Sequence, residues 1–191
     1  MANPLPFDER IELAGHLTVL ARRFYDVWWY YEGADTRPSI LDAMNLFPEF
    51  FRFDTHAQFV SLVTHLAALY ENRNGTINFE TLITEAENAS LVSESALDEA
   101  KATLSSVSAL RPKVAILRSN LFSHRSASLS YEAAFAKAEI TPFQLRDLTV
   151  VGLKIANTLL AARGLPEPFF SNSTLNHTKN LLQALANHAR S

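Results

Sequence analysis

The sequence contains no cysteine and only five glycines among its 191 residues. Without cysteine the chain forms no disulfide bond, thiolate zinc site or cysteine nucleophile, which fits a reducing cytoplasm. So few glycines leave little from which to build a glycine-rich loop around a nucleotide phosphate. The P-loop, His-Glu-x-x-His and nucleophile-elbow motifs are also missing from the sequence. Several large enzyme classes are therefore excluded.

Long apolar runs and a basic leader are missing as well. Residues 1–8 contain no basic region followed by an apolar stretch, so we expect no signal peptide. The most apolar run, residues 149–162, is interrupted by Lys154 and Asn157 and is shorter than the ~20 residues that span a bilayer. We expect a cytoplasmic protein without membrane contact. Its 48% apolar residues suffice for the core of one domain over residues 1–191.

No stretch alternates apolar and polar residues over the length of a strand, and no internal repeat is found. Apolar residues recur instead at three- and four-residue steps, which is typical of amphipathic helices. We expect an all-α fold, an up-and-down bundle of four or five long helices joined by short ones. The predicted helices cover residues 8–31, 39–47, 49–71, 78–88, 93–125, 131–139, 142–163 and 172–190.

Several helix ends are predicted from single residues. Asn78 is expected to cap the helix that runs to residue 88. Ser95 with Asp98 predicts one capping box, and the stretch Thr141-Pro-Phe-Gln144 predicts another. Pro112 falls inside the pattern of residues 93–125. We expect it to kink or split that helix, because a proline in a helix interior costs ~3 kcal/mol.

Four consecutive aromatic residues, Trp28-Trp29-Tyr30-Tyr31, end the first predicted helix. Four successive helical residues fan over about 300°, so they cannot all face one core. One interpretation places two of them in the core and two against a neighbouring segment of the same chain. A second places Trp28, Trp29 and Tyr31 in a homodimer interface. Stacking on nucleic-acid bases is a third, which the lack of a nearby basic cluster disfavours.

Charge is unevenly distributed along the chain. The net charge is −3, yet residues 100–131 contain no aspartate or glutamate. The remaining sequence carries 12 basic and 20 acidic residues. A local basic segment in an acidic chain indicates a site for an anionic partner. The basic residues of this segment are Lys101, Arg111, Lys113, Arg118 and Arg125.

An arginine and a histidine, Arg118 and His124, stand six positions apart in this segment. In a continuous helix six residues turn the chain by a net ~240° and raise it ~9 Å, so one helix would not aim both side chains at one atom. A helix irregularity, the long reach of arginine, or a second copy across a two-fold axis could bring them together. Asn120 shares a face with His124, and Arg118 shares one with Arg125.

These residue types suit the cleavage of RNA without a metal. Histidine moves protons near neutral pH, and arginine stabilises a phosphate that gains charge in a transition state. The nucleophile would be the ribose 2′-hydroxyl, so no serine or cysteine of the protein is needed and DNA would be spared. The spacing alone is also consistent with an ordinary charged helix face that carries a solvated histidine.

The stretch Arg118-Ser-Asn-Leu-Phe-Ser-His124 resembles the signature of the HEPN superfamily, an arginine followed by four to six residues and a histidine. The surroundings also resemble its branch tied to phage abortive infection (AbiU-like): Leu66-Ala-Ala-Leu-Tyr70, a polar turn, Phe79-Glu-Thr-Leu-Ile83 and the start at Thr141. The resemblance covers about residues 8–163 and leaves the predicted helix 172–190 as an addition. Ser119 stands where the family commonly has asparagine or aspartate.

The resemblance implies a helical bundle that dimerises and sets two arginine-histidine motifs face to face. It implies a metal-independent ribonuclease with a toxin or phage-defence role, needing no cofactor or metal. Arg118 and His124 would be the catalytic pair. RNA, a second copy of the chain, and a cognate antitoxin or regulator are the expected partners. The substrate-binding residues predicted around the pair are Ser119, Asn120, Arg125, Arg111 and Lys113.

Two alternatives remain open at the level of the sequence. The same basic segment could belong to a non-catalytic HEPN-like module that binds RNA, a nucleotide or a partner protein. The chain could instead be a helical interaction protein whose partner face includes Trp28 to Tyr31. The remaining histidines have no second ligand at metal-binding spacing and are interpreted as surface or boundary residues: His16, His56, His65, His177 and His188.

Overall fold

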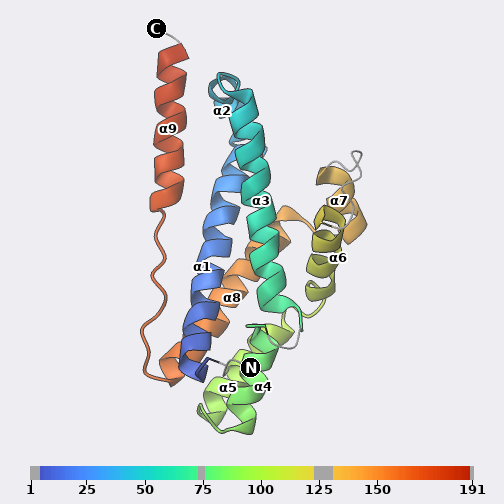
Figure 1. Cartoon of the computed structure of the whole chain (residues 1–191), viewed down its shortest axis with the longest axis vertical. Helices are drawn as coiled ribbons and strands as arrows, with labels where there is room; N and C mark the ends of the chain where they lie inside the picture. Colours follow the sequence, from blue (N-terminus) through green and yellow to red (C-terminus); the bar gives the residue numbers. More distant parts are fainter. Residues whose placement is uncertain (1–4, 73–75, 123–130, 190–191) are drawn as a thin grey trace.

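The structure, a computed structural model, describes residues 5–72, 76–122 and 131–189. This part of the chain contains nine helices and no strand, which confirms the predicted all-α class (Figure 1). The helices are α1 (Phe7–Glu32), α2 (Arg37–Met44), α3 (Pro48–Tyr70), α4 (Phe79–Asn88), α5 (Glu94–Ser105), α6 (Arg111–Phe122), α7 (Tyr131–Ala138), α8 (Pro142–Ala162) and α9 (Ser173–Ala189).

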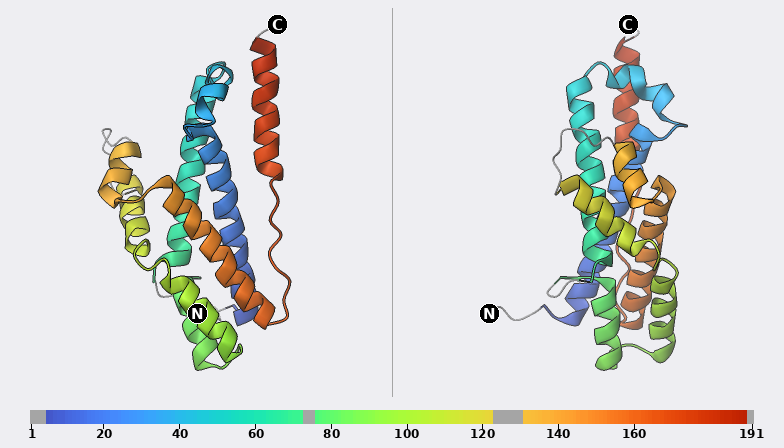
Figure 2. Two further views of the ribbon diagram at one scale, coloured as in Figure 1. Left: turned by 180° about the vertical axis from the view of Figure 1, so that it is seen from behind. Right: turned by 90° about the vertical axis from the view of Figure 1, so that its right-hand side faces the viewer.

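The three longest helices form the centre of the bundle. Helix α1 packs along both α3 and α8, and the views in Figures 1 and 2 show these three side by side. Their apolar stripes meet in one main core, in which Ile11, Phe59 and Leu148 are fully buried. Burial of such stripes supplies most of the stability of helices in water, because isolated helices of this length are marginal.

The aromatic end of α1 belongs largely to the interior of the chain. Trp28 is 3% exposed and packs against Phe59 of α3 and Phe135 of α7, with ring centroids 5.0 and 5.9 Å away. Tyr31 is also 3% exposed, and its hydroxyl donates to Asp54 Oδ2 at 2.9 Å. Trp29 is half-buried against Phe143. The burial of Trp28 and Tyr31 within one chain favours the core interpretation, and a dimer interface there stays a prediction.

The short helices α4 and α5 lie at one end of the central bundle (Figure 1). Asn78 caps α4 as predicted, since its side chain accepts from the backbone N–H of Thr81 at 2.9 Å. The predicted capping box of Ser95 and Asp98 is wrong. Ser93 caps α5 instead and accepts from Ala96 N, so Ser95 and Asp98 already lie inside the helix.

Pro112 splits the long pattern of residues 93–125 into two helices. Helix α5 ends at Ser105, a turn follows, and α6 begins at Arg111 with the proline in its first turn, where its missing N–H costs nothing. The break changes the neighbours of the chain: α5 packs on α4 and α8, whereas α6 packs on α3 and α7. It thereby brings α6, with Arg111, Lys113 and Arg118, alongside α3 (Figure 2).

Helix α8 begins with the predicted capping box. The Thr141 hydroxyl accepts from Gln144 N, and the Gln144 side chain accepts from Thr141 N. The helix ends before Gly164, whose φ of +68° is a backbone conformation that glycine adopts without strain. None of the helices in the described ranges is long and apolar enough to cross a membrane.

A connector leads from α8 back along the bundle to α9, which lies beside α1 and α2 (Figure 1). Leu182 of α9 is 1% exposed and belongs to a second apolar cluster, separate from the main core. The other buried members of that cluster are Val27, Tyr31, Ile40, Ala43, Met44 and Phe51, so α9 closes the end of the bundle that α1, α2 and α3 form.

Candidate functional site

Five of the predicted site residues lie on α6. The catalytic candidate His124 and the predicted RNA contact Arg125 lie outside the described residues, as does the rest of residues 123–130. The site can therefore be built from the arginine side of the predicted pair. The described members on α6 are Arg111, Lys113, Arg118, Ser119 and Asn120.

Arg118 reaches across to the end of α3. Its Nε lies 3.1 Å from Oε1 of Glu71, the residue that follows the last turn of α3. The Arg118 side chain is 25% exposed and that of Glu71 only 11%. A pair this far removed from water is screened less than a surface pair, so it holds the guanidinium in one place.

Arg111 lies seven residues, or about two helical turns, before Arg118 and reaches the same end of α3. Its Nε donates to the carbonyl oxygen of Tyr70 at 3.2 Å, and its Nη2 forms an ion pair with Glu80 of α4. Cations are favoured beside the last carbonyls of a helix, where the dipole is negative. Both arginines of α6 are thus directed at the C-terminus of α3.

The remaining polar residues of α6 differ in their exposure. Lys113 donates to the carbonyl oxygen of Glu139 at 2.6 Å, which links α6 to the end of α7. Ser119 is exposed. Asn120 is only 5% exposed, and its Nδ2 donates to Ile116 O at 2.9 Å. Asn120 is therefore held inside the fold by its own helix, and its predicted contact with RNA stays a prediction.

A shallow hollow of about 420 Å³ lies beside Arg111 and Glu71, the partner of Arg118. Tyr70, Glu71 and Arg111 form part of its wall. Tyr70 itself is fully buried, its hydroxyl donates to Leu148 O at 2.6 Å, and burial raises the pKa of this phenol far above its usual value. Tyr70 is thus a structural donor between α3 and α8, whereas the charged side chains around the hollow can meet an anion.

Among the described residues, no three histidine, aspartate or glutamate side chains are grouped so that they could hold a metal ion. The acidic partners of the arginines come from elements distant in sequence. Glu71 and Glu80 were not singled out from the sequence, although Glu71 stands directly after the apolar stripe of a long predicted helix. This position of Glu71, a charged residue at the end of a buried apolar stripe, is the one feature of the sequence that could have identified it as a site residue.

Comparison with known proteins gives a single family. The AbiU2 family model, a HEPN family, matches residues 5–162, which is well over half of the chain. No curated protein and no solved structure matches the chain. The matched range runs from the start of α1 to the end of α8, so it includes α6 with Arg118 and leaves out α9. The chain therefore belongs to the AbiU2 family of HEPN proteins, the abortive-infection branch of that superfamily.

Proposed function

We propose that this chain is a metal-independent endoribonuclease of HEPN type with a toxin or phage-defence role. One observation carries the proposal: a member of a HEPN family has Arg118 and His124 at the superfamily's spacing within its acid-free segment. The surroundings of Arg118 are consistent with it. Glu71 holds the planar, permanently charged guanidinium of Arg118. Glu71 also lines the open hollow beside Arg111.

The reaction needs one proton acceptor and one anion-stabilising group. His124 accepts the proton of a ribose 2′-hydroxyl, and the 2′-oxygen attacks the adjacent phosphorus. Arg118 stabilises the additional negative charge of the phosphorane-like state. The bond to the 5′-oxygen breaks, and that oxygen takes up the proton that His124 had accepted. The products carry a 2′,3′-cyclic phosphate and a 5′-hydroxyl. Neither residue is consumed, and the attacking group comes from the RNA.

A homodimer supports this chemistry better than a single chain. In a continuous helix, six residues would turn the chain by a net ~240°, so one helix would not direct an arginine and a histidine at this spacing to the same atom. Two copies related by a two-fold axis would place the arginine of one protomer near the histidine of its partner. Helix α6 contacts α3 and α7 and lies beside the central helices, a position from which it could meet a second α6 (Figure 2).

The Arg118–Glu71 pair is compatible with phosphate binding. Its closest contact is through Nε, and a guanidinium carries five N–H donors. In the proposed site Glu71 fixes the direction of the side chain, and the two Nη groups form the fork that accepts phosphate oxygens. An arginine held in this way loses less conformational freedom when it binds the substrate.

The test is incubation of the purified protein with end-labelled total RNA in EDTA, beside the variant His124→Ala. Wild type is expected to cleave and to leave 2′,3′-cyclic phosphate ends, whereas His124→Ala leaves the RNA intact. His177→Ala is the matched control, because His177 is an exposed histidine on α9, outside the family range. Cleavage by His124→Ala at the wild-type rate would remove the assignment.

A non-catalytic HEPN-like binding module is the second candidate, and one observation favours it. The described basic side chains of α6 are already engaged: Arg111 with Glu80, Lys113 with Glu139 O, and Arg118 with Glu71. A segment neutralised by its own chain leaves less charge for RNA, which favours a partner protein among the ligands of this candidate. This candidate predicts a complex with RNA or a protein that weakens as salt rises, without any cleavage product.

A further inference from the structure

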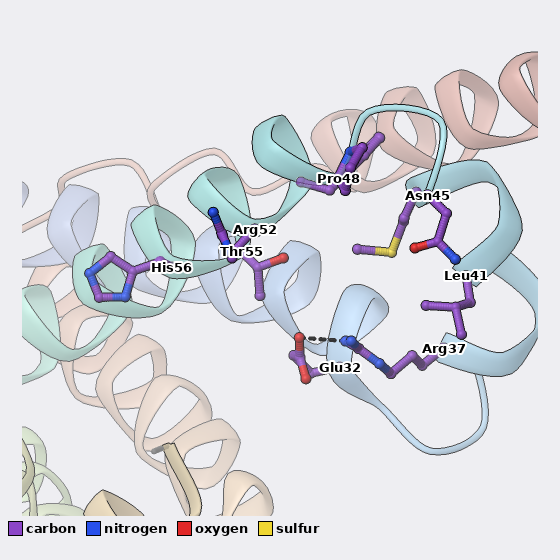
Figure 3. A pocket seen from close by; sticks show the side chains of 10 residues that line it. Glu32, Arg37, Leu41, Asn45, Pro48, Arg52, Thr55 and His56 are labelled. Carbon is purple, nitrogen blue, oxygen red and sulfur yellow. Dashed lines mark hydrogen bonds and ion pairs between the residues drawn. The ribbon is translucent and has the colours of Figure 1, made fainter. Parts of the chain in front are cut away.

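A cavity of about 380 Å³ lies at the end of the bundle where α1, α2 and the start of α3 meet (Figure 3). Its volume is in the range of small-molecule sites, which measure ~300–1,000 Å³. The cavity is remote from the α6 site: Thr55 precedes Glu71 by 16 residues of α3, a rise of ~24 Å. Family membership and the ribonuclease proposal therefore do not account for it.

One wall of the cavity carries a buried hydroxyl group without a hydrogen bond. Thr55 is 5% exposed, and its Oγ1 has no partner among the described residues. Other helical threonines use this group within their own helix: Thr18 donates to Ala14 O and Thr64 to Val60 O, both at 2.7 Å. A buried hydroxyl without a partner has lost its hydrogen bonds to water, so this group is set up to receive a partner that enters the cavity.

The opposite side of the cavity carries an arginine that is paired with a glutamate. Arg37 of α2 pairs through Nη1 with Glu32 Oε1 at 2.5 Å and with Tyr31 O at 3.2 Å. Figure 3 shows the Arg37–Glu32 pair across the cavity from Thr55. Both contacts use the same nitrogen, so the Nε and Nη2 donors remain for a ligand. A second guanidinium, that of Arg52, stands at the rim.

Two acidic side chains lie near these arginines. Glu32 already pairs with Arg37, and Glu49 pairs with Arg52 outside the cavity. The Arg52–Glu49 pair is 76% and 82% exposed, and pairs in that setting hold each other weakly. Arg37 is therefore the arginine expected to bind an anion in the cavity.

The rest of the lining is apolar. Met44 and Phe51 are buried and belong to the second apolar cluster, and Leu41 exposes 39% of its surface on this side of α2. Apolar walls with a few convergent polar groups are the usual composition of a small-molecule site. We infer that this cavity binds a small anion with a compact apolar body, such as an aryl phosphate or aryl carboxylate.

In the inferred complex the anionic group accepts from Thr55 Oγ1 and from Arg37, and the ring lies on Leu41 and Met44. The experiment is isothermal titration calorimetry of the full chain with phenyl phosphate and with benzoate. Inorganic phosphate and benzyl alcohol are the two half-ligands. We expect an aryl anion to bind saturably and with higher affinity than inorganic phosphate or benzyl alcohol. The aryl anion contacts the polar and the apolar walls of the cavity together, whereas each half-ligand contacts only one of them.

Three variants test the assignment. Thr55→Val keeps the shape of the side chain and removes the hydroxyl, and we expect roughly tenfold weaker binding. Leu41→Trp fills the cavity from an exposed position and should abolish binding without disturbing the core. Thr64→Val, on an exposed turn of the same helix, should bind as wild type does.

Three outcomes would overturn the inference. They are the absence of saturable binding by either aryl anion, equal affinity of wild type and Thr55→Val, and inorganic phosphate binding as tightly as phenyl phosphate. The last would mean an adventitious ion only. Thr55→Val should cleave RNA at the wild-type rate whether or not the cavity binds an aryl anion. A negative binding result therefore leaves the ribonuclease proposal unaffected.

Discussion

Nε of Arg118 lies 3.1 Å from Oε1 of Glu71, an ion pair that joins the middle of α6 to the end of α3. Glu71 is 11% exposed, so this contact differs from the surface pairs of the same chain. The pair places the arginine of the family motif against a fixed anion. The contribution of this ion pair to folding stability and the role of Arg118 in RNA cleavage can be tested separately.

The structural role is tested by Glu71→Gln. We expect this change to lower the free energy of unfolding by about 1–3 kcal/mol, because it leaves the partly buried guanidinium without its counter-charge. Urea denaturation followed by circular dichroism measures the effect. Glu49→Gln is the control, since the Glu49–Arg52 pair is exposed and should contribute within about 0.5 kcal/mol. Equal effects of the two changes would show that burial of the Glu71 pair has no energetic consequence.

The functional role is tested by Arg118→Lys. Lysine keeps the positive charge but lacks the planar fork, so it cannot hold Glu71 and a phosphate in the same geometry. If the ribonuclease proposal is correct, the cleavage rate should fall by about 10²-fold, the usual cost of removing one anion-stabilising donor. Single-turnover cleavage of a short labelled RNA measures this. A rate within twofold of wild type would assign the anion-stabilising role to another residue.

Close packing between α8 and its neighbours predicts the effect of Gly152→Ala. An added Cβ would lie 2.9 Å from Thr18 Cγ2, 3.2 Å from the Tyr70 hydroxyl and 3.3 Å from Phe79. We expect a loss of about 1–3 kcal/mol in unfolding free energy. Adding Thr18→Ser removes the nearest methyl and keeps the hydroxyl that donates to Ala14 O, so it should restore part of the loss. No rescue would indicate that Thr18 is not the limiting contact.

Two adjacent leucines of α9 differ in burial, so alanine substitutions at them should have different effects on stability. Leu182 is 1% exposed in the second apolar cluster, whereas Leu181 is 47% exposed. Leu182→Ala should therefore cost about 2–4 kcal/mol or detach α9, and Leu181→Ala should stay within about 0.5 kcal/mol of wild type. Thermal unfolding and hydrogen exchange of α9 amides measure both effects. Similar behaviour of the two variants would contradict the packing of α9 described above.

Stability at high pH is expected to depend on Tyr25. Burial raises the pKa of its phenol to about 12, and the hydroxyl has no hydrogen-bond partner among the described residues. The unfolded chain ionises this group near pH 10, so stability is complete below pH 10 and falls as the pH rises from about 10 to 12. Tyr25→Phe should lose about 1.4 kcal/mol less than wild type between pH 8 and pH 11 in urea unfolding. An unchanged difference between the two pH values would show that Tyr25 ionises normally.

Local signals predicted the helices well because their causes are local. The capping box at Thr141, the cap at Asn78 and the break at Pro112 each depend on a few neighbouring residues. The error at Ser95 has a local cause too: Ser93, two residues earlier, satisfies the first free N–H groups of α5 and leaves Ser95 inside the helix.

The surroundings of the candidate site depend on contacts between distant segments, which the sequence pattern does not reveal. Arg118 was predicted as a site residue, but its pairing with Glu71 joins two helices that the short helices α4 and α5 separate along the chain. Asn120 was predicted to face the RNA because it shares a helical face with His124. In the structure the Asn120 side chain is buried, and its amide donates to Ile116 O.

The break at Pro112 makes α6, the helix that carries Arg118, a structural unit separate from α5. Because α5 is attached to α4 and α8 while α6 is attached to α3 and α7, the register of one helix is set independently of the other. A shift or swivel of α6 about the turn at residues 106–110 would leave the interface between α5 and α8 intact. The arginine helix can therefore change its orientation without disturbing the packing of α5 on the central bundle.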